Sequence, residues 1–86
     1  MAGAVTPGMI EAEILRRTRA TEKSICPSEV ARGLLPEKWQ PLMGAVRAAA
    51  GRLSDAGQIE ILRKGKAIPP EAMHGVLRLR RRPDSE

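Results

Sequence analysis

The spacing of apolar residues changes along the chain, and the first pattern is helical. From Ile10 onward, apolar residues recur every three to four positions, as they do on one face of a helix. Thr6 and Pro7 suit a helix start, because a hydroxyl at the N-cap accepts a backbone hydrogen bond and proline fits the first turn. We therefore expect a helix over about residues 7–20, preceded by a flexible N-terminus of residues 1–6.

A second, shorter helix is predicted to open at Pro27. Glu29 lies in its first turn, and Gly33 and Pro36 bring it to an end. A helix this short is not stable alone in water, so it must pack between its neighbours, as the first helix of a helix-turn-helix does. The preceding residues 24–26 are long enough only for a strand fragment.

The third helix has the clearest pattern. One stripe of apolar residues recurs at helical spacing: Trp39, Leu42, Val46, Ala49 or Ala50, and Leu53. Because proline is tolerated only in the first turn, the regular helix should begin between Trp39 and Pro41. Gly57 supplies the left-handed residue that commonly ends a helix. The opposite face is small-sided with one prominent cation, and it carries Gln40, Gly44, Arg47, Ala48 and Gly51.

Beyond Gly57 the period falls to two, which indicates strands. Ile59 and Ile61 alternate with polar residues, as in a half-buried strand. Residues 64–66 are a turn signal, and residues 67–75, with two adjacent prolines, should form a loop. Alternation resumes over residues 76–80, where two leucines would join the core face: Leu77 and Leu79.

These elements follow the order of a winged helix-turn-helix. We therefore predict a mainly α fold with a small β-hairpin (α+β), built from three helices and a two- or three-stranded wing. With 86 residues the chain has room for one domain, which we place at residues 7–81, followed by a polar tail at 82–86.

Charge is distributed unevenly and points to a polyanionic partner. Fifteen Lys and Arg against ten acids give a net charge of +5. Residues 63–82 hold seven cations and one acid, whereas the remaining sequence has a net charge of −1. The excess positive charge therefore lies in the predicted wing and its returning strand, which favours contact with nucleic acid.

Residues suited to catalysis or metal binding are few. His74 is the only histidine and Cys26 the only cysteine, so an ordinary zinc site or a catalytic triad cannot be assembled from them. We expect no enzymatic activity and no cofactor. The chain also lacks an apolar run long enough to span a membrane and an N-terminal signal, so we expect a cytoplasmic protein that does not enter membranes.

The favoured function is therefore binding of double-stranded DNA, with the third helix in the major groove and the wing on phosphates. The candidate contacts are Gln40, Gly44, Arg47, Arg63, Lys64, Lys66, Arg80, Arg81 and Arg82. Several of these contacts have a second interpretation. Gly44 is equally suited to packing between the second and third helices, and Arg80, Arg81 and Arg82 also suit a disordered basic tail. Arg47 is equally suited to an ion pair with Glu29 or Glu37, and the wing cations also suit a solvated hairpin. The scarcity of aromatic residues argues against single-strand recognition.

The alternative function is a protein-interaction or dimerisation module that does not bind nucleic acid. Either the first helix or the outer face of the wing would pair with another chain, and the first helix offers an apolar seam formed by Met9, Ile10, Ala12 and Leu15.

Two segments resemble a small family of uncharacterised bacterial proteins that is known as a domain of unknown function. The first segment runs from Pro27-Ser28-Glu29-Val30-Ala31-Arg32 through Trp39, Leu42-Met43, Val46-Arg47, Ala50 and Leu53 to Gly57-Gln58-Ile59. The second comprises Gly65, residues 68–70, Gly75 and residues 77–80. The resemblance implies a winged-helix fold over about residues 9–81, and it implies no activity. The family pattern has an acid before the wing-loop proline and a proline after its later glycine, whereas this chain has Ile68 and Val76 there.

Overall fold

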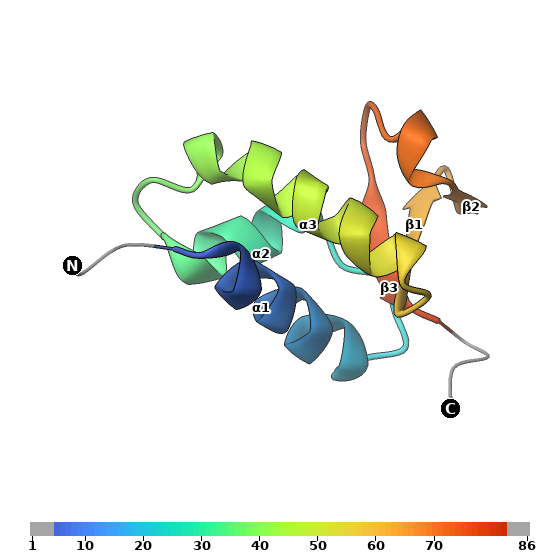
Figure 1. Cartoon of the computed structure of the whole chain (residues 1–86), viewed down its shortest axis with the longest axis horizontal. Helices are drawn as coiled ribbons and strands as arrows, with labels where there is room; N and C mark the ends of the chain where they lie inside the picture. The colour runs from blue at the N-terminus through green and yellow to red at the C-terminus, as the bar shows by residue number, and fades with distance from the viewer. Residues whose placement is uncertain (1–4, 83–86) are drawn as a thin grey trace.

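A computed structural model of the protein, which describes residues 5–82, shows three helices packed against a small antiparallel sheet (Figure 1). The helices are α1 (Pro7–Arg19), α2 (Pro27–Leu34) and α3 (Met43–Asp55). The strands are β1 (Ile59–Arg63), β2 (Lys66–Ile68) and β3 (Arg78–Arg81). Most of the predicted flexible N-terminus (residues 1–4) and most of the predicted polar tail (residues 83–86) lie outside the described residues. The predicted α+β class is confirmed, and the arrangement is compatible with a winged helix.

The first helix begins where Thr6 and Pro7 predict, and it ends at Arg19, within one residue of the expected range. The Thr6 hydroxyl accepts a hydrogen bond from the Met9 backbone N–H at 3.1 Å, so the first turn has a side-chain cap. Ile10 and Ile14 face the core. Thr18 is also buried, and its hydroxyl donates to the Ile14 carbonyl at 2.9 Å, which satisfies its polar group.

The second helix starts at Pro27, as predicted, and its short length is offset by packing. Pro27, Val30 and Ala31 are buried between α1 and α3. At its start, the Cys26 backbone N–H donates to the Glu29 carboxylate at 3.2 Å. This contact satisfies a donor that the helix itself leaves unpaired.

The third helix differs from the prediction at its start. A 3₁₀ turn, η1 (Gln40–Leu42), contains Pro41, and the regular α-helix begins only at Met43. The predicted core stripe is confirmed for Val46, Ala49, Ala50 and Leu53, which are buried, while Trp39 and Leu42 are half-buried. Gly57 follows the helix with φ of 77°, as its helix-ending role requires.

The sheet has the strand order β2-β1-β3, and both pairs are antiparallel. Lys64 and Gly65 form the two-residue turn between β1 and β2, and their φ values of 52° and 80° match the turn that suits a tight hairpin. The predicted loop over 67–75 is therefore wrong at its start, because β2 extends to Ile68. Both flanking strands pair with β1, which makes β1 the central strand.

The predicted strand fragment near residue 25 is confirmed as a single bridge to the last strand. The Ile25 N–H donates to the Leu79 carbonyl at 2.7 Å, and the Leu79 N–H donates to the Ile25 carbonyl at 2.8 Å. This bridge connects the segment between α1 and α2 to the sheet. Ile25 and Leu79 are both buried in the core together with Ile59 and Ile61.

The segment between β2 and β3 packs on α3 rather than extending into solvent. Its 3₁₀ turn, η2 (Pro70–Ala72), contacts the helix next to Gly51. A methyl group at Gly51 would lie 3.5 Å from the Met73 side chain and 3.6 Å from that of Pro70. Gly51 is therefore buried, and its predicted place on an open outer face is wrong, because the wing loop (residues 69–77) covers that part of the helix.

Candidate nucleic-acid interface

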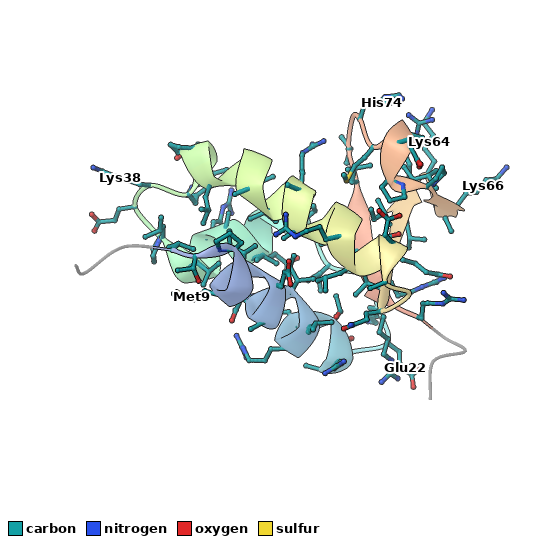
Figure 2. The ribbon with its side chains drawn as sticks, viewed as in Figure 1. Met9, Glu22, Lys38, Lys64, Lys66 and His74 are labelled. Atoms are coloured by element: carbon teal, nitrogen blue, oxygen red, sulfur yellow. The ribbon has the colours of Figure 1, made fainter. Side chains whose placement is uncertain are left out.

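The wing tip presents two exposed lysines on a rigid hairpin. Lys64 lies in the two-residue turn and Lys66 begins β2, directly opposite Arg63 in the strand register. Figure 2 shows Lys66 extending away from the fold and Lys64 at the upper edge of the sheet. Among residues 5–82, neither lysine has a hydrogen-bond or ion-pair partner. Both ammonium groups are therefore available to an anion.

The third predicted wing cation, Arg63, is held against the wing loop. One of its terminal nitrogens lies 3.0 Å from each ring nitrogen of His74. His74 is exposed, as expected of a loop residue, and its label in Figure 2 marks the top of the loop. Arg63, Lys64 and Lys66 thus gather at one end of the molecule, and we call them the wing-tip cluster.

The predicted contacts on the returning strand are already engaged. Arg80 donates to the Glu60 carboxylate at 2.6 Å across the β1–β3 pair, and Arg81 lies 3.3 Å from that of Glu22. The Arg82 guanidinium lies beside Gly57, where it would be 3.3 Å from an added methyl carbon. The surroundings of Arg80, Arg81 and Arg82 therefore differ from those of the wing-tip cluster, whose two lysines have no carboxylate beside them among residues 5–82.

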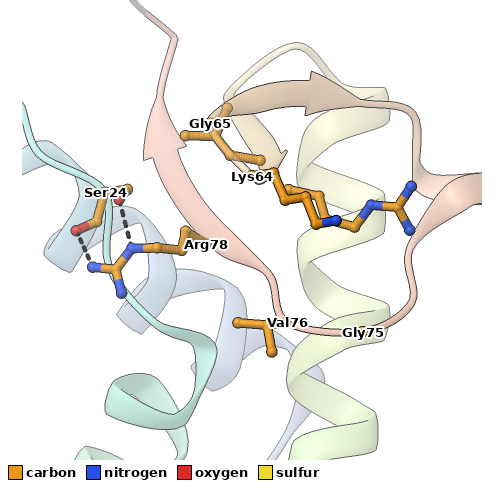
Figure 3. A pocket seen from close by; sticks show the side chains of 8 residues that line it. Ser24, Lys64, Gly65, Gly75, Val76 and Arg78 are labelled. Carbon is orange, nitrogen blue, oxygen red and sulfur yellow. Dashed lines mark hydrogen bonds between the residues drawn. The ribbon is translucent and has the colours of Figure 1, made fainter.

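Arg78 belongs with the wing, although the sequence-based list of contacts omitted it. Its Nε donates to the Ser24 hydroxyl at 2.7 Å, and a terminal nitrogen donates to the Ser24 carbonyl at 2.8 Å (Figure 3). No carboxylate pairs with Arg78 among the residues that the structure describes. Its outward position in the alternating strand was the signal that could have identified it.

The outer face of α3 is smooth and neutral. Gly44 and Ala48 are exposed, and a methyl group added at Gly44 would meet no atom within 4 Å. Gln40 is exposed in the 3₁₀ turn before the helix. Arg52, further along, donates to the Glu11 carboxylate on α1 at 2.6 Å. A partner could approach the backbone of this face closely, but it would find little charge there.

Arg47 contacts the wing loop instead of forming the ion pair that the sequence offered as an alternative to a nucleic-acid contact. It is half-buried, and it donates to the Gly75 carbonyl at 3.0 Å. Within residues 5–82, the ion pair with Glu29 or Glu37 is not formed. Arg47 thereby connects α3 to the wing loop, and it helps to set the position of the wing-tip cluster relative to the helix.

Electrostatic interactions on α1, outside this interface, shift the pKa of one carboxyl group. The pKa of Glu13 on α1 is lowered, first because Arg16 hydrogen-bonds to its carboxylate, and Arg17 adds a second such bond at 2.6 Å. Among the described residues, no cluster of three or more His, Cys, Asp and Glu could hold a metal ion. Every helix of residues 5–82 is also too short or too polar to cross a membrane.

A family model supports the part of the resemblance that concerns a small domain of unknown function. The family described as "Protein of unknown function (DUF3253)" matches residues 8–82, from the first turn of α1 to the residue after β3. The chain belongs to this family. A comparison of the DUF3253 chain with curated proteins gave no match.

The DUF3253 match covers every element that forms the candidate interface. Its range includes α3, the β1–β2 hairpin and the wing loop, so all nine predicted contact residues lie inside the family domain. The structure brings Arg63, Lys64 and Lys66 together at the wing tip. It places Gln40 in the 3₁₀ turn before α3 and Gly44 in the first turn of that helix, and Arg47 on α3 donates to the wing loop.

Proposed function

We propose that the DUF3253 domain is a non-catalytic module that binds double-stranded DNA through its wing. The observation that carries the proposal is the pair of exposed lysines on the hairpin, Lys64 and Lys66, which have no acidic partner among residues 5–82. A phosphate backbone requires positive charge at about the right place and little geometric precision. A short hairpin between two paired strands satisfies this requirement.

The surroundings of α3 support binding with low sequence specificity. In the proposed complex the helix faces the major groove, and Gln40 is the polar side chain best placed to reach base edges. Gly44 and Ala48 allow close approach but carry no group that could hydrogen-bond to a base edge. Since Arg47 donates to the Gly75 carbonyl, its proposed role is mainly to hold the wing at a defined position beside α3.

The paired arginines contribute less in this proposal. Arg80 and Arg81 already form ion pairs with Glu60 and Glu22, so binding of these arginines to phosphate would break those ion pairs. The wing-tip cluster therefore provides most of the attraction. A cytoplasmic location in a bacterium, where duplex DNA is accessible, is part of the proposal.

The absence of catalysis is also proposed, and the neighbour of His74 supports it. A general base needs a group that orients its ring, and in known hydrolytic triads this group is a carboxylate. The group beside His74 is the Arg63 guanidinium. We therefore assign His74 to the structure of the wing loop.

A titration of random-sequence duplex at two salt concentrations tests the proposal. Affinity should fall steeply with salt, because each neutralised phosphate releases counterions. The double variant K64A/K66A should lower the slope of log K against log salt by up to about 2. The control R19A/K23A removes the same charge from two exposed residues, one at the end of α1 and one in the segment after it. Affinity that does not depend on salt, or equal losses in both variants, would contradict the proposal.

The structure does not favour the alternative seam on α1. Ile10 is part of the core, and Leu15 is half-buried against it. Of the four seam residues, Met9 and Ala12 are exposed. In Figure 2, Met9 lies on the far side of the molecule from Lys64 and His74. Two exposed residues are too small an apolar surface for a stable dimer.

A further inference from the structure

A groove opens at the base of the wing, between the hairpin turn and the start of β3 (Figure 3). Its volume is about 630 Å³, a size that accommodates peptide side chains or small ligands. Eight residues line it: Ser24, Leu62, Arg63, Lys64, Gly65, Gly75, Val76 and Arg78. The proposed DNA contacts use only the cations at its edge.

The floor of the groove is apolar and does not belong to the main core. Leu62 is only 7% exposed, yet it points to the opposite face of β1 from Ile59 and Ile61 and is absent from the core cluster. Val76, which also lines the groove, is 84% exposed. A partner that covers Val76 would therefore remove apolar surface from water.

Two glycines keep the walls open. A methyl group added at Gly65 or Gly75 would meet no atom within 4 Å. Both residues have φ near 80°, a conformation that side-chain-bearing residues rarely adopt. Because both glycines are exposed and carry no side chain, the backbone of both walls is accessible to a bound segment.

The rim of the groove is cationic on both sides. Arg63 and Lys64 lie on one side and Arg78 on the other, and none of the lining residues is acidic. Ser24 accepts two hydrogen bonds from Arg78 and so fixes its guanidinium, whose remaining N–H groups stay available. The Arg78 guanidinium is thus held in a fixed orientation beside the apolar floor.

We infer that this groove binds an acidic peptide segment of a protein partner, with one apolar side chain on Leu62 and Val76 and flanking carboxylates on Arg63, Lys64 and Arg78. Charge complementarity identifies the occupant, because three cations surround a floor that a phosphate backbone would leave unused. A segment with an apolar residue between acids uses both features. The inference does not depend on DNA binding by the wing tip.

A short fluorescent peptide with one leucine between glutamates, capped at both ends, is the probe. Its anisotropy should rise on titration with the protein, and the same peptide with serine in place of leucine should bind about tenfold more weakly. The variant Val76→Ser should cause a similar loss of about tenfold. Because Val76 is exposed, this variant should melt at the same temperature as the parent protein.

Two controls separate the groove from general charge attraction. Met9→Ser changes another exposed apolar side chain, 45% exposed on α1, and should leave peptide affinity unchanged. Arg78→Gln should weaken peptide binding, and Arg78→Lys should restore part of it. Val76→Ser should leave affinity for random duplex unchanged, so this result separates the peptide site from the proposed DNA contact. Equal binding of the leucine and serine peptides, or unchanged peptide affinity in Val76→Ser, would overturn the inference.

Discussion

Replacing Gly51 tests whether the wing loop is docked on α3. Glycine in a helix interior costs about 1 kcal/mol relative to alanine. An added methyl carbon would lie 3.5 Å from Met73 and 3.6 Å from Pro70, which are ordinary contact distances. We therefore expect Gly51→Ala to raise the free energy of unfolding by about 0.5–1 kcal/mol.

Leucine at the same position should have the opposite effect. Its additional carbons extend beyond the methyl position into Met73 and Pro70, and overpacking of this kind costs about 1–3 kcal/mol. This cost exceeds the gain in helix propensity, so Gly51→Leu should be less stable than Gly51→Ala by about 1–3 kcal/mol. Gly44 is the matched control, because nothing lies within 4 Å of its added methyl group. Gly44→Ala and Gly44→Leu should both stabilise.

Urea unfolding followed by Trp39 fluorescence is the assay. Trp39 is the only tryptophan, it is half-buried, and the Arg32 guanidinium lies 4.4 Å from its ring centre, so unfolding should change its emission. Hydrogen exchange supplies a local readout. The Met73 N–H donates to the Pro70 carbonyl at 3.1 Å, and it should exchange faster in Gly51→Leu. Equal stability of Gly51→Leu and Gly44→Leu would refute the docking of the loop.

Three further changes probe other parts of the fold. Glu13→Gln should destabilise the protein by about 1 kcal/mol at neutral pH. Because folding lowers the pKa of Glu13, the difference in stability between the two proteins should disappear as the pH falls through the carboxyl range. Thermal melts recorded from pH 7 downward measure this difference. Gly65→Ala, at φ of 80°, should cost about 1 kcal/mol in urea unfolding, and an unchanged midpoint would contradict the turn geometry. Arg47→Ala should free the Gly75 carbonyl and lower duplex affinity alike for all sequences; altered sequence preference would instead indicate contact with bases.

Local signals in the sequence were sufficient to predict most of the fold. The Thr6 cap, the proline that opens α2 and the left-handed Gly57 each act over a few residues, so the pattern around them predicts helix ends. The change of period after Gly57 likewise predicted the strands. β2 was missed because its three residues are exposed or half-exposed, so it shows no alternation.

The surroundings of the candidate site depended on tertiary contacts that no local pattern contains. Arg47 meets a carbonyl 28 positions away, and the pairing of Arg80 with Glu60 follows from the strand register. Gly51 was assigned to an open face because a residue without a side chain leaves no hydrophobic signal when it is buried. The groove at Val76 was missed because segments that are distant in the sequence form it: Ser24, the hairpin turn and the residues around the start of β3.

The bridge between Ile25 and Leu79 has a consequence for the order of folding. It joins residues 54 positions apart, and Leu79 fills the centre of the core. During synthesis, the helices emerge first, but Ile25, Ile59 and Ile61 lack their partner until Leu79 has been made. Closing so long a loop is a slow step relative to helix formation. The nascent chain therefore leaves these isoleucines without part of their core packing until its final strand has been made.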